Sequence, residues 1–163
     1  MPGTTVILDG GTTGMAIAAA LRPDLTATII THSPTTAAVL AGHPSVDVIM
    51  LGGRLHKRSA VACGAAAAEA ASGISADLCL LVVAGIHPKG GLTAGDPDEA
   101  AMRRILVGRG ADTYVVASIE KIGTVAPYAV VGLSDVVGLV TDAPVDNPTI
   151  QQLRKQGVSV IQA

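Results

Sequence analysis

Short apolar runs alternate along this chain with segments whose apolar residues recur at helical spacing. Runs rich in Val, Ile and Leu predict β-strands over residues 4–8, 26–31, 46–51, 78–85, 113–118, 136–141 and 158–162. Helical spacing predicts helices over residues 13–21, 33–43, 98–110 and 147–157, and residues 60–73 predict a short strand and an alanine-rich helix. Strands that alternate with helices indicate an α/β fold, in which a parallel-rich sheet is flanked by helices in a Rossmann-like arrangement.

Helix starts and loops refine this pattern. Ser33 and Asn147 each precede a proline, as is typical of an N-cap followed by the first residue of a helix. The glycines and prolines of residues 86–98 predict a loop. The run 78–85 is apolar throughout, as expected of a strand that is covered on both faces. Because connections are short and no linker is evident, we expect one domain over residues 1–163.

The composition limits the possible functions. Of the 163 residues 49% are hydrophobic, Phe and Trp are absent, and Tyr114 and Tyr128 are the only aromatics, so the core must be aliphatic. A net charge of −2 and a pI near 6.0 disfavour a nucleic-acid surface, which needs basic patches and stacking aromatics. The sequence has neither a long uncharged apolar run nor a signal segment. We therefore expect a soluble, cytoplasmic protein with no membrane partner.

No residue pattern indicates a metal, a cofactor or covalent catalysis. Cys63 and Cys79 lie in core-like runs and are expected to be small buried hydrophobes. The histidines lack metal-ligand spacing, and no serine or cysteine has the surroundings of a catalytic nucleophile. We therefore predict neither a metal site nor a cofactor.

The stretch VILDGGTTGMAIAAAL, residues 6–21, contains the strongest candidate site. A strand ends there in a carboxylate and continues through two glycines and two threonines into a helix: Asp9, Gly10, Gly11, Thr12 and Thr13. The glycines expose amide N–H groups, the threonines add hydroxyl donors, and the helix directs its positive end to the same point. These features predict an anion site, with an ordinary strand-to-helix turn as the alternative.

Asp9 narrows the kind of anion. A dinucleotide fingerprint would have a glycine in its place, and a P-loop would add a Gly-Lys-Ser/Thr sequence that is missing here. A carboxylate beside the loop repels phosphate, so we expect Asp9 to accept hydrogen bonds from ligand hydroxyls or to hold the loop amides. Phosphate next to a hydroxyl acceptor points to a phosphorylated sugar or polyol.

Three other segments lie where parallel strands are expected to end, which is where ligands bind in such sheets. They contribute Ser33, the basic residues Arg54, Lys57 and Arg58 behind a Gly-Gly pair, and Lys121. A lysine after a strand can meet an anion as a point charge. Each segment has a plain alternative: a helix cap for Ser33, and solvated surface charges for the basic residues.

The acids Asp96, Asp98 and Glu99 decide whether an enzyme is expected. A sugar-phosphate isomerase needs a base above the sugar, and a glycine-rich loop that ends in carboxylates could supply one. The same residues suit the first turn of a helix, where a capping Asp and further acids complement the helix dipole. We favour the helix interpretation.

The order and spacing of several short motifs resemble the C-terminal sensor domain of DeoR-type transcriptional regulators. The motifs are LDGGTT, ITHS, IMLGGRL, ADLCLLVVAGI, GLTAGDPDEAAMRR and VVASIEKIG, and the similarity extends from about Val6 to Val160. The resemblance implies the fold that ribose-5-phosphate isomerase shares with coenzyme A transferases. It also implies a non-enzymatic domain that binds a phosphorylated sugar or related metabolite and so changes the DNA affinity of an N-terminal winged helix-turn-helix.

The same resemblance implies a set of ligand-binding residues. A phosphate and sugar loop, the pocket wall and supporting positions would be formed by Asp9, Gly11, Thr12, Thr13, Ser33, Gly52, Gly53, Asp77, Gly85, Glu99 and Lys121. Three positions depart from the usual residues of the family: His32 replaces an Asn, Ser118 an Asp and Ile122 a Phe. The missing Asp removes a hydroxyl acceptor, so the identity of the sugar cannot be transferred from a relative.

No helix-turn-helix precedes Val6, and the chain starts almost directly in a core strand. This start favours a domain of a longer, homo-oligomeric repressor of carbohydrate-metabolism genes, which contacts DNA only through its N-terminal domain, over the alternative of a free-standing sensor-like protein. The alternative function is a sugar-phosphate isomerase or deaminase, with Glu99 or Asp98 as base and Lys121 as its electrostatic partner.

Overall fold

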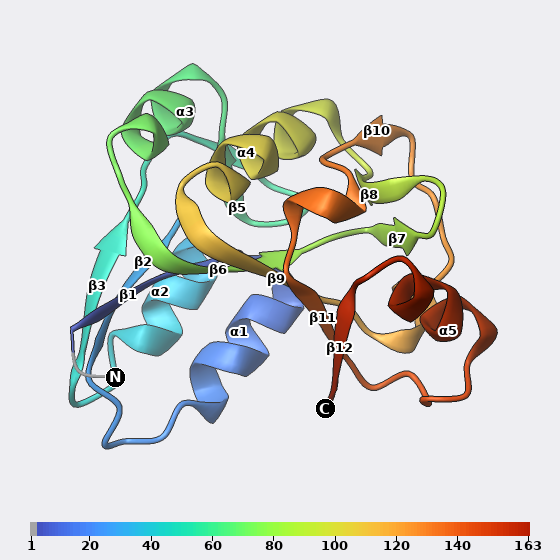
Figure 1. Ribbon diagram of the computed structural model, residues 1–163. Coiled ribbons are helices and arrows are strands. Elements are labelled where there is room, and N and C mark those ends of the chain that lie inside the picture. The colour runs from blue at the N-terminus through green and yellow to red at the C-terminus, as the bar shows by residue number, and fades with distance from the viewer. Residues whose placement is uncertain (1–2) are drawn as a thin grey trace.

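The computed structural model describes residues 3–163 and is built around a parallel sheet of seven strands (Figure 1). In spatial order these are β12 (Ser159–Gln162), β11 (Gly138–Thr141), β9 (Gly110–Val116), β6 (Ala76–Val82), β1 (Thr4–Leu8), β2 (Ala27–Thr31) and β3 (Val46–Met50). Each neighbouring pair is parallel. The predicted α/β, Rossmann-like arrangement is therefore confirmed.

Five α-helices of the described residues connect these strands and cover the sheet. They are α1 (Gly11–Ala20), α2 (Pro34–Leu40), α3 (Ala65–Ser72), α4 (Pro97–Val107) and α5 (Pro148–Lys155). α1 and α2 lie on one face, and α3 and α4 on the other (Figure 1). The larger core cluster lies on the α3–α4 side, and the smaller one consists of Leu8, Ala18, Ile29 and Leu40. None of these helices is long and apolar enough to cross a membrane.

Helix starts follow the sequence pattern closely. The Oγ of Ser33 accepts a hydrogen bond from the backbone N–H of Thr36 at 3.3 Å and caps α2. The Oδ1 of Asn147 accepts from the N–H of Thr149 at 2.9 Å and caps α5 in the same way. α1 begins at Gly11, two residues before the predicted start, because Gly11 and Thr12 add no apolar residue to the helical pattern from which the start was predicted.

Two small antiparallel sheets flank the central one. One of them shows that the prediction of a loop over residues 86–98 is wrong. β4 (Arg54–His56) and β5 (Val61–Cys63) form a hairpin, while β7 (Gly85–His87), β8 (Gly91–Ala94) and β10 (Tyr128–Ala129) form a three-stranded sheet. Residues 86–98 thus contain two strands, and the glycines that suggested a loop form the turn between them. Strands of two to four residues are too short to show an alternating pattern. Two 3-10 turns, η1 (Ile119–Lys121) and η2 (Leu133–Asp135), complete the fold.

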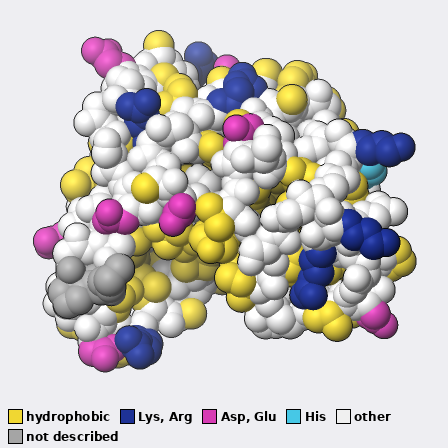
Figure 2. Space-filling view, in the orientation of Figure 1, with side chains coloured by type: hydrophobic (Ala, Val, Ile, Leu, Met, Phe, Trp, Pro, Cys, Tyr) yellow, Lys and Arg dark blue, Asp and Glu magenta, His cyan; other side chains and the backbone are white. Residues whose placement is uncertain are grey.

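β6 is covered differently on its two sides. Cys79 and Leu81 are fully buried, whereas Leu78 and Leu80 are half-buried, so the expectation of full cover on both faces is wrong for the α1 side. The half-buried side lines an apolar groove of about 240 Å³ beside α1, and Figure 2 shows apolar side chains at the surface beneath the sheet. Cys79 and Cys63 are buried free thiols, as predicted.

The centre of the sheet contains the point at which the chain reverses its direction of winding. From β1 the chain continues through α1 to β2 on one side, and from β6 it continues through α4 to β9 on the other side. The two helices lie on opposite faces (Figure 1). In sheets of this kind a crevice opens at the carboxyl ends of these two strands and is the usual ligand site.

Gly14 allows α1 to pack closely against the backbone at the end of β1. A Cβ at Gly14 would lie 2.1 Å from the backbone O of Asp9, whereas the nearest atom to a Cβ at Gly42 is 3.8 Å away. We expect Gly14→Ala to lower the free energy of unfolding by about 1–3 kcal/mol, because β1 must shift. The matched variant Gly42→Ala should change it by no more than about 1 kcal/mol. Urea unfolding measures both, and equal effects would contradict this role of Gly14.

Candidate functional site

The carboxylate of Asp9 is fully buried at the end of β1 and accepts four hydrogen bonds from the protein. Its Oδ1 accepts from the backbone N–H of Gly10 and from Nε2 of His32, each at 2.7 Å. Its Oδ2 accepts from the backbone N–H of Val82 at 3.0 Å and from Nε of Arg103 at 2.9 Å. A carboxylate has about four acceptor positions. The geometry therefore favours support of the loop amides over contact with ligand hydroxyls.

His32 joins this carboxylate to the β4–β5 hairpin. Its Nδ1 lies 2.8 Å from the carbonyl O of Ala62, and its Nε2 lies 2.7 Å from Oδ1 of Asp9. Both partners are acceptors, so both contacts are hydrogen bonds only when each ring nitrogen carries a hydrogen.

Arg103 supplies the main counter-charge of Asp9. It is 7% exposed, and its Nη2 also lies 3.4 Å from Oε1 of Glu99. Burial acts to raise the pKa of Asp9, but the charge of Arg103 and the hydrogen bond from His32 outweigh it and hold this pKa well below its ordinary value. The ion pair likewise raises the pKa of Arg103, although burial opposes this.

The N-terminus of α1 presents amide groups to the crevice. Its N-cap residue, Gly10, offers no side chain to accept from the amides of the first turn. A Cβ on Gly10 would lie 2.4 Å from Cγ1 of Val61, and Gly11 has a φ of 76°, which favours glycine. Both glycines are thus fixed by geometry. The positive end of α1 faces the crevice, with Thr12 and Thr13 in its lining.

The crevice is a cleft of about 410 Å³, a volume in the range of small-molecule sites, roughly 300–1,000 Å³. Its walls come from the start of α1, the end of β6, the β4–β5 hairpin, the start of α4 and η1. The polar lining residues are Thr12, Thr13, His56, Arg58, Ser59, Asp96, Glu99, Arg103, Ser118, Glu120 and Lys121. Of the predicted residues, the fold therefore brings Gly11, Thr12, Thr13, Glu99 and Lys121 together.

The free basic groups of the cleft come from two segments. Lys121 belongs to η1, and Arg58 belongs to the turn of the β4–β5 hairpin. Arg54 and Lys57, which the sequence grouped with Arg58, line a neighbouring pocket instead. Ser118 lines the cleft, so the carboxylate that the family usually has at this position would also lie in the cleft.

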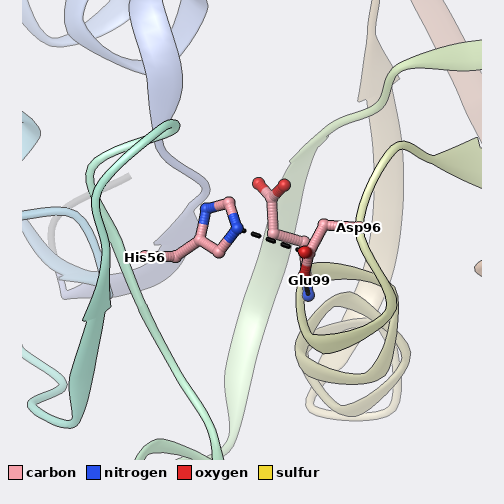
Figure 3. Close-up of side chains that lie close together, drawn as sticks. All are labelled: His56, Asp96 and Glu99. Atoms are coloured by element: carbon pink, nitrogen blue, oxygen red, sulfur yellow. Dashed lines mark hydrogen bonds and ion pairs between the residues drawn. The ribbon is translucent and has the colours of Figure 1, made fainter.

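The β4–β5 hairpin meets α4 across one side of the cleft. The Nε2 of His56 lies 3.2 Å from Oδ2 of Asp96, as Figure 3 shows, and its Nδ1 lies 2.9 Å from Oγ of Ser59. The Oδ1 of Asp96 caps α4 by accepting from the N–H groups of Asp98 and Glu99. Burial acts to raise the pKa of Asp96, but these bonds and His56 lower it. The predicted capping role is confirmed.

Ser33 and Asp77 have structural partners outside the cleft lining. Ser33 is fully buried and caps α2, which is the alternative interpretation of this residue. The Oδ2 of Asp77 accepts from the backbone N–H of Thr5 at 2.8 Å. Asp77 and Thr5 both lie near the starts of their strands, so Asp77 is at the end of the sheet opposite the cleft. Neither residue belongs to the lining of the cleft, so their contact with a ligand stays a prediction, while the contacts described stabilise the sheet and a helix end.

Two of the three remaining predicted glycines act through packing. A Cβ on Gly53 would lie 2.7 Å from the Cβ of Ala67 in α3, and one on Gly85 would lie 2.4 Å from the carbonyl O of Thr124. Apart from its chain neighbours, a Cβ on Gly52 would have no atom of the described residues within 4 Å, so packing does not require a glycine there. None of the three glycines belongs to the cleft lining. Gly53 and Gly85 allow the close approach of neighbouring elements.

The sequence pattern did not indicate the buried partners of Asp9. Arg103 is 94 residues away from Asp9, and in sequence it is an ordinary arginine on a helix. One local signal was available: Glu99 and Arg103 are spaced i,i+4, which places them on the same helix face. His56 lies in a strand too short to recognise, so its contact with α4 had no signal in the sequence.

Comparisons with known proteins agree with the resemblance in the motifs. A family model described as the DeoR C terminal sensor domain matches residues 1–143. The chain is 28% identical to the HTH-type transcriptional regulator GlpR of Haloferax volcanii, over 98% of this chain and 62% of that protein. It is also 28% identical to the HTH-type transcriptional repressor GlcR of Bacillus subtilis, over 98% of this chain and 61% of that repressor.

A third relative is the glycerol-3-phosphate regulon repressor of Escherichia coli K12, which is 29% identical over 87% of this chain and 56% of that repressor. The chain thus spans about 60% of the length of the relatives it matches. These relatives are named as transcriptional regulators or repressors, which agrees with the expectation of a regulatory domain.

Removing the charge of Asp9 tests the buried ion pair. Asp9→Asn leaves Arg103 buried without its counter-charge, and we expect it to lower the free energy of unfolding at pH 7 by about 3–5 kcal/mol. Because the folded-state pKa of Asp9 lies below the unfolded value, its stabilisation is present above about pH 4 and is lost as the pH falls further. The difference between wild type and variant should therefore shrink from pH 7 to pH 2 in urea unfolding.

The exposed variant Asp24→Asn is the matched control, because the ion pair of Asp24 with Arg22 lies at the surface. We expect it to change the free energy of unfolding by less than about 1 kcal/mol. An Asp9→Asn protein as stable as this control at pH 7 would contradict the role given to the ion pair.

Proposed function

The chain belongs to the family of DeoR C-terminal sensor domains, and from this we propose that its cleft binds a phosphorylated sugar or related metabolite as a signal. The observation that carries the proposal is the uncapped N-terminus of α1, which opens into a cleft lined by Thr12, Thr13 and Lys121. Backbone amides at a helix start, hydroxyl donors and a mobile ammonium together suit a phosphate group.

The rest of the lining suits the polyhydroxylated part of such a ligand. Asp96, Glu99 and Glu120 place carboxylates in the cleft, and Ser118 and His56 add groups that donate or accept. Carboxylates are effective acceptors for the hydroxyl groups of a sugar. Asp9 contributes indirectly, since its hydrogen bond to Gly10 fixes the backbone that presents the amides.

The arrangement of the acids favours binding over catalysis. A general base needs a carboxylate that faces the substrate and has a pKa close to the working pH. Asp96 is occupied in capping α4 and its pKa is lowered, while Glu99 lies against the guanidinium of Arg103. The isomerase or deaminase alternative would use Glu99 or Asp98 as base and Lys121 as partner. Asp98 lines the neighbouring pocket rather than this cleft.

In the longer relatives the corresponding domain belongs to proteins named as regulators of transcription. We propose the same for the whole protein: ligand binding favours one arrangement of a homo-oligomer and so alters DNA binding by a separate domain. The apolar groove beside α1 supports contact with a second copy. A target in the metabolism of phosphorylated sugars or polyols is supported by the relative named as a glycerol-3-phosphate regulon repressor.

A panel of phosphorylated metabolites tests the proposal. We expect at least one compound among glucose 6-phosphate, ribose 5-phosphate and glycerol 3-phosphate to raise the melting temperature, while its unphosphorylated counterpart does not. Lys121→Met should weaken binding about tenfold or more, because a hydrogen bond to a charged group contributes about 1.5–3 kcal/mol. Lys155→Met, in the last turn of α5, is the matched control and should bind as wild type does.

Two outcomes would contradict the proposal. The first is that no phosphorylated compound stabilises the protein, or that Lys121→Met binds as tightly as Lys155→Met. The second is steady aldose–ketose conversion or deamination that Glu99→Gln abolishes, which would establish the enzyme alternative.

A further inference from the structure

Three metal-ligating side chains converge at one wall of the cleft. They are His56 at the end of β4 and Asp96 and Glu99 at the start of α4, and Figure 3 shows the two carboxylates on the side of α4 that faces the imidazole. One donor atom from each lies within 4.8 Å of the other two. The sequence indicated no metal site, because His56 lies 40 residues before Asp96 and the donors come from two different elements.

Within the part of the chain that the structure describes, one donor atom of each side chain has no hydrogen-bond partner outside this group of three residues. The Nδ1 of His56 is hydrogen-bonded to Ser59, so its Nε2 faces the two acids. The Oδ1 of Asp96 is used in capping α4, and its Oδ2 points to the imidazole. Only Oε1 of Glu99 contacts Arg103, at 3.4 Å, which leaves its other oxygen for the cleft. A neighbouring group that orients a ligating histidine is typical of metal sites.

We propose that His56, Asp96 and Glu99 bind a divalent first-row metal ion, with Mn²⁺ as the probe of choice. Metal–ligand bonds of about 2.0–2.2 Å place adjacent donor atoms roughly 3 Å apart, and the Nε2 of His56 is 3.2 Å from Oδ2 of Asp96. Two carboxylate oxygens and one imidazole nitrogen suit Mn²⁺ and Zn²⁺ better than Mg²⁺, which prefers oxygen donors alone.

The charge balance of the cleft supports this assignment. The lining holds the acids Asp96, Glu99 and Glu120 and the bases Arg58, Arg103 and Lys121, and Arg103 is already paired with the buried carboxylate of Asp9. A phosphate dianion would add two negative charges to this lining, more than Lys121 and Arg58 can balance beside the acids. A divalent cation at the wall of the same cleft supplies the missing counter-charge, so each ion should favour the binding of the other.

This inference shares the cleft with the proposed function, but its test does not depend on any phosphate ligand. We would titrate the whole chain with Mn²⁺ alone and follow free Mn²⁺ by electron paramagnetic resonance. The variants are His56→Ala, Glu99→Gln and Asp96→Asn, the last because Asn also caps helices. We expect each to weaken Mn²⁺ binding about tenfold or more. His43→Ala is the control, because His43 is not among the residues that line the cleft. This variant should leave Mn²⁺ binding unchanged.

Far-ultraviolet circular dichroism and thermal melting verify that each variant is folded before titration. Absence of Mn²⁺ binding to wild type, or binding that the folded His56→Ala and Glu99→Gln proteins retain, would overturn the metal site whatever the phosphate panel gives. A second titration in inorganic phosphate tests the coupling, and tighter Mn²⁺ binding in phosphate is the expected result. Conversely, Mn²⁺ binding without any effect of phosphorylated compounds would sustain the metal site and count against the proposed function.

Discussion

The ion pair of Asp9 and Arg103 is the interaction on which the rest of the site depends. Asp9 ends β1 and receives hydrogen bonds from Val82 at the end of β6, from His32 at the end of β2 and from the loop that starts α1. Arg103 brings α4 to the same carboxylate. One buried charge thus holds three strands and two helices at the point where the chain reverses its winding.

This constraint explains why the cleft has its shape and its chemistry. A buried carboxylate needs several donors, and two of those donors are the backbone N–H groups of Gly10 and Val82. Their positions fix the start of α1 and the end of β6, which both line the cleft. Arg103 holds α4 in place, and α4 in turn places Asp96 and Glu99 beside His56 of the β4–β5 hairpin.

Much of this architecture could be predicted from local sequence, and the rest could not for identifiable reasons. The seven strands of the main sheet and the capping roles of Ser33, Asp96 and Asn147 follow from short-range patterns. The hairpin that carries His56 has strands of only three residues, which show no periodicity. The partnership of Asp9 with Arg103 joins residues 94 positions apart, so no local pattern indicates that the two side chains meet. The resemblance placed Ser33 and Asp77 at a ligand, and in the fold both have structural partners outside the cleft lining, so their ligand roles stay predictions.

We propose above all that the backbone amides at the start of α1 bind a phosphate group. The most direct measurement is an NMR titration of the ¹⁵N-labelled protein with the phosphorylated compound that stabilises it best, following backbone amide shifts. We expect the largest changes in amide chemical shift at Gly11, Thr12 and Thr13, and smaller ones around Lys121. Largest changes along the apolar groove beside α1, or on the three-stranded sheet, with Gly11 to Thr13 unmoved, would contradict this proposal.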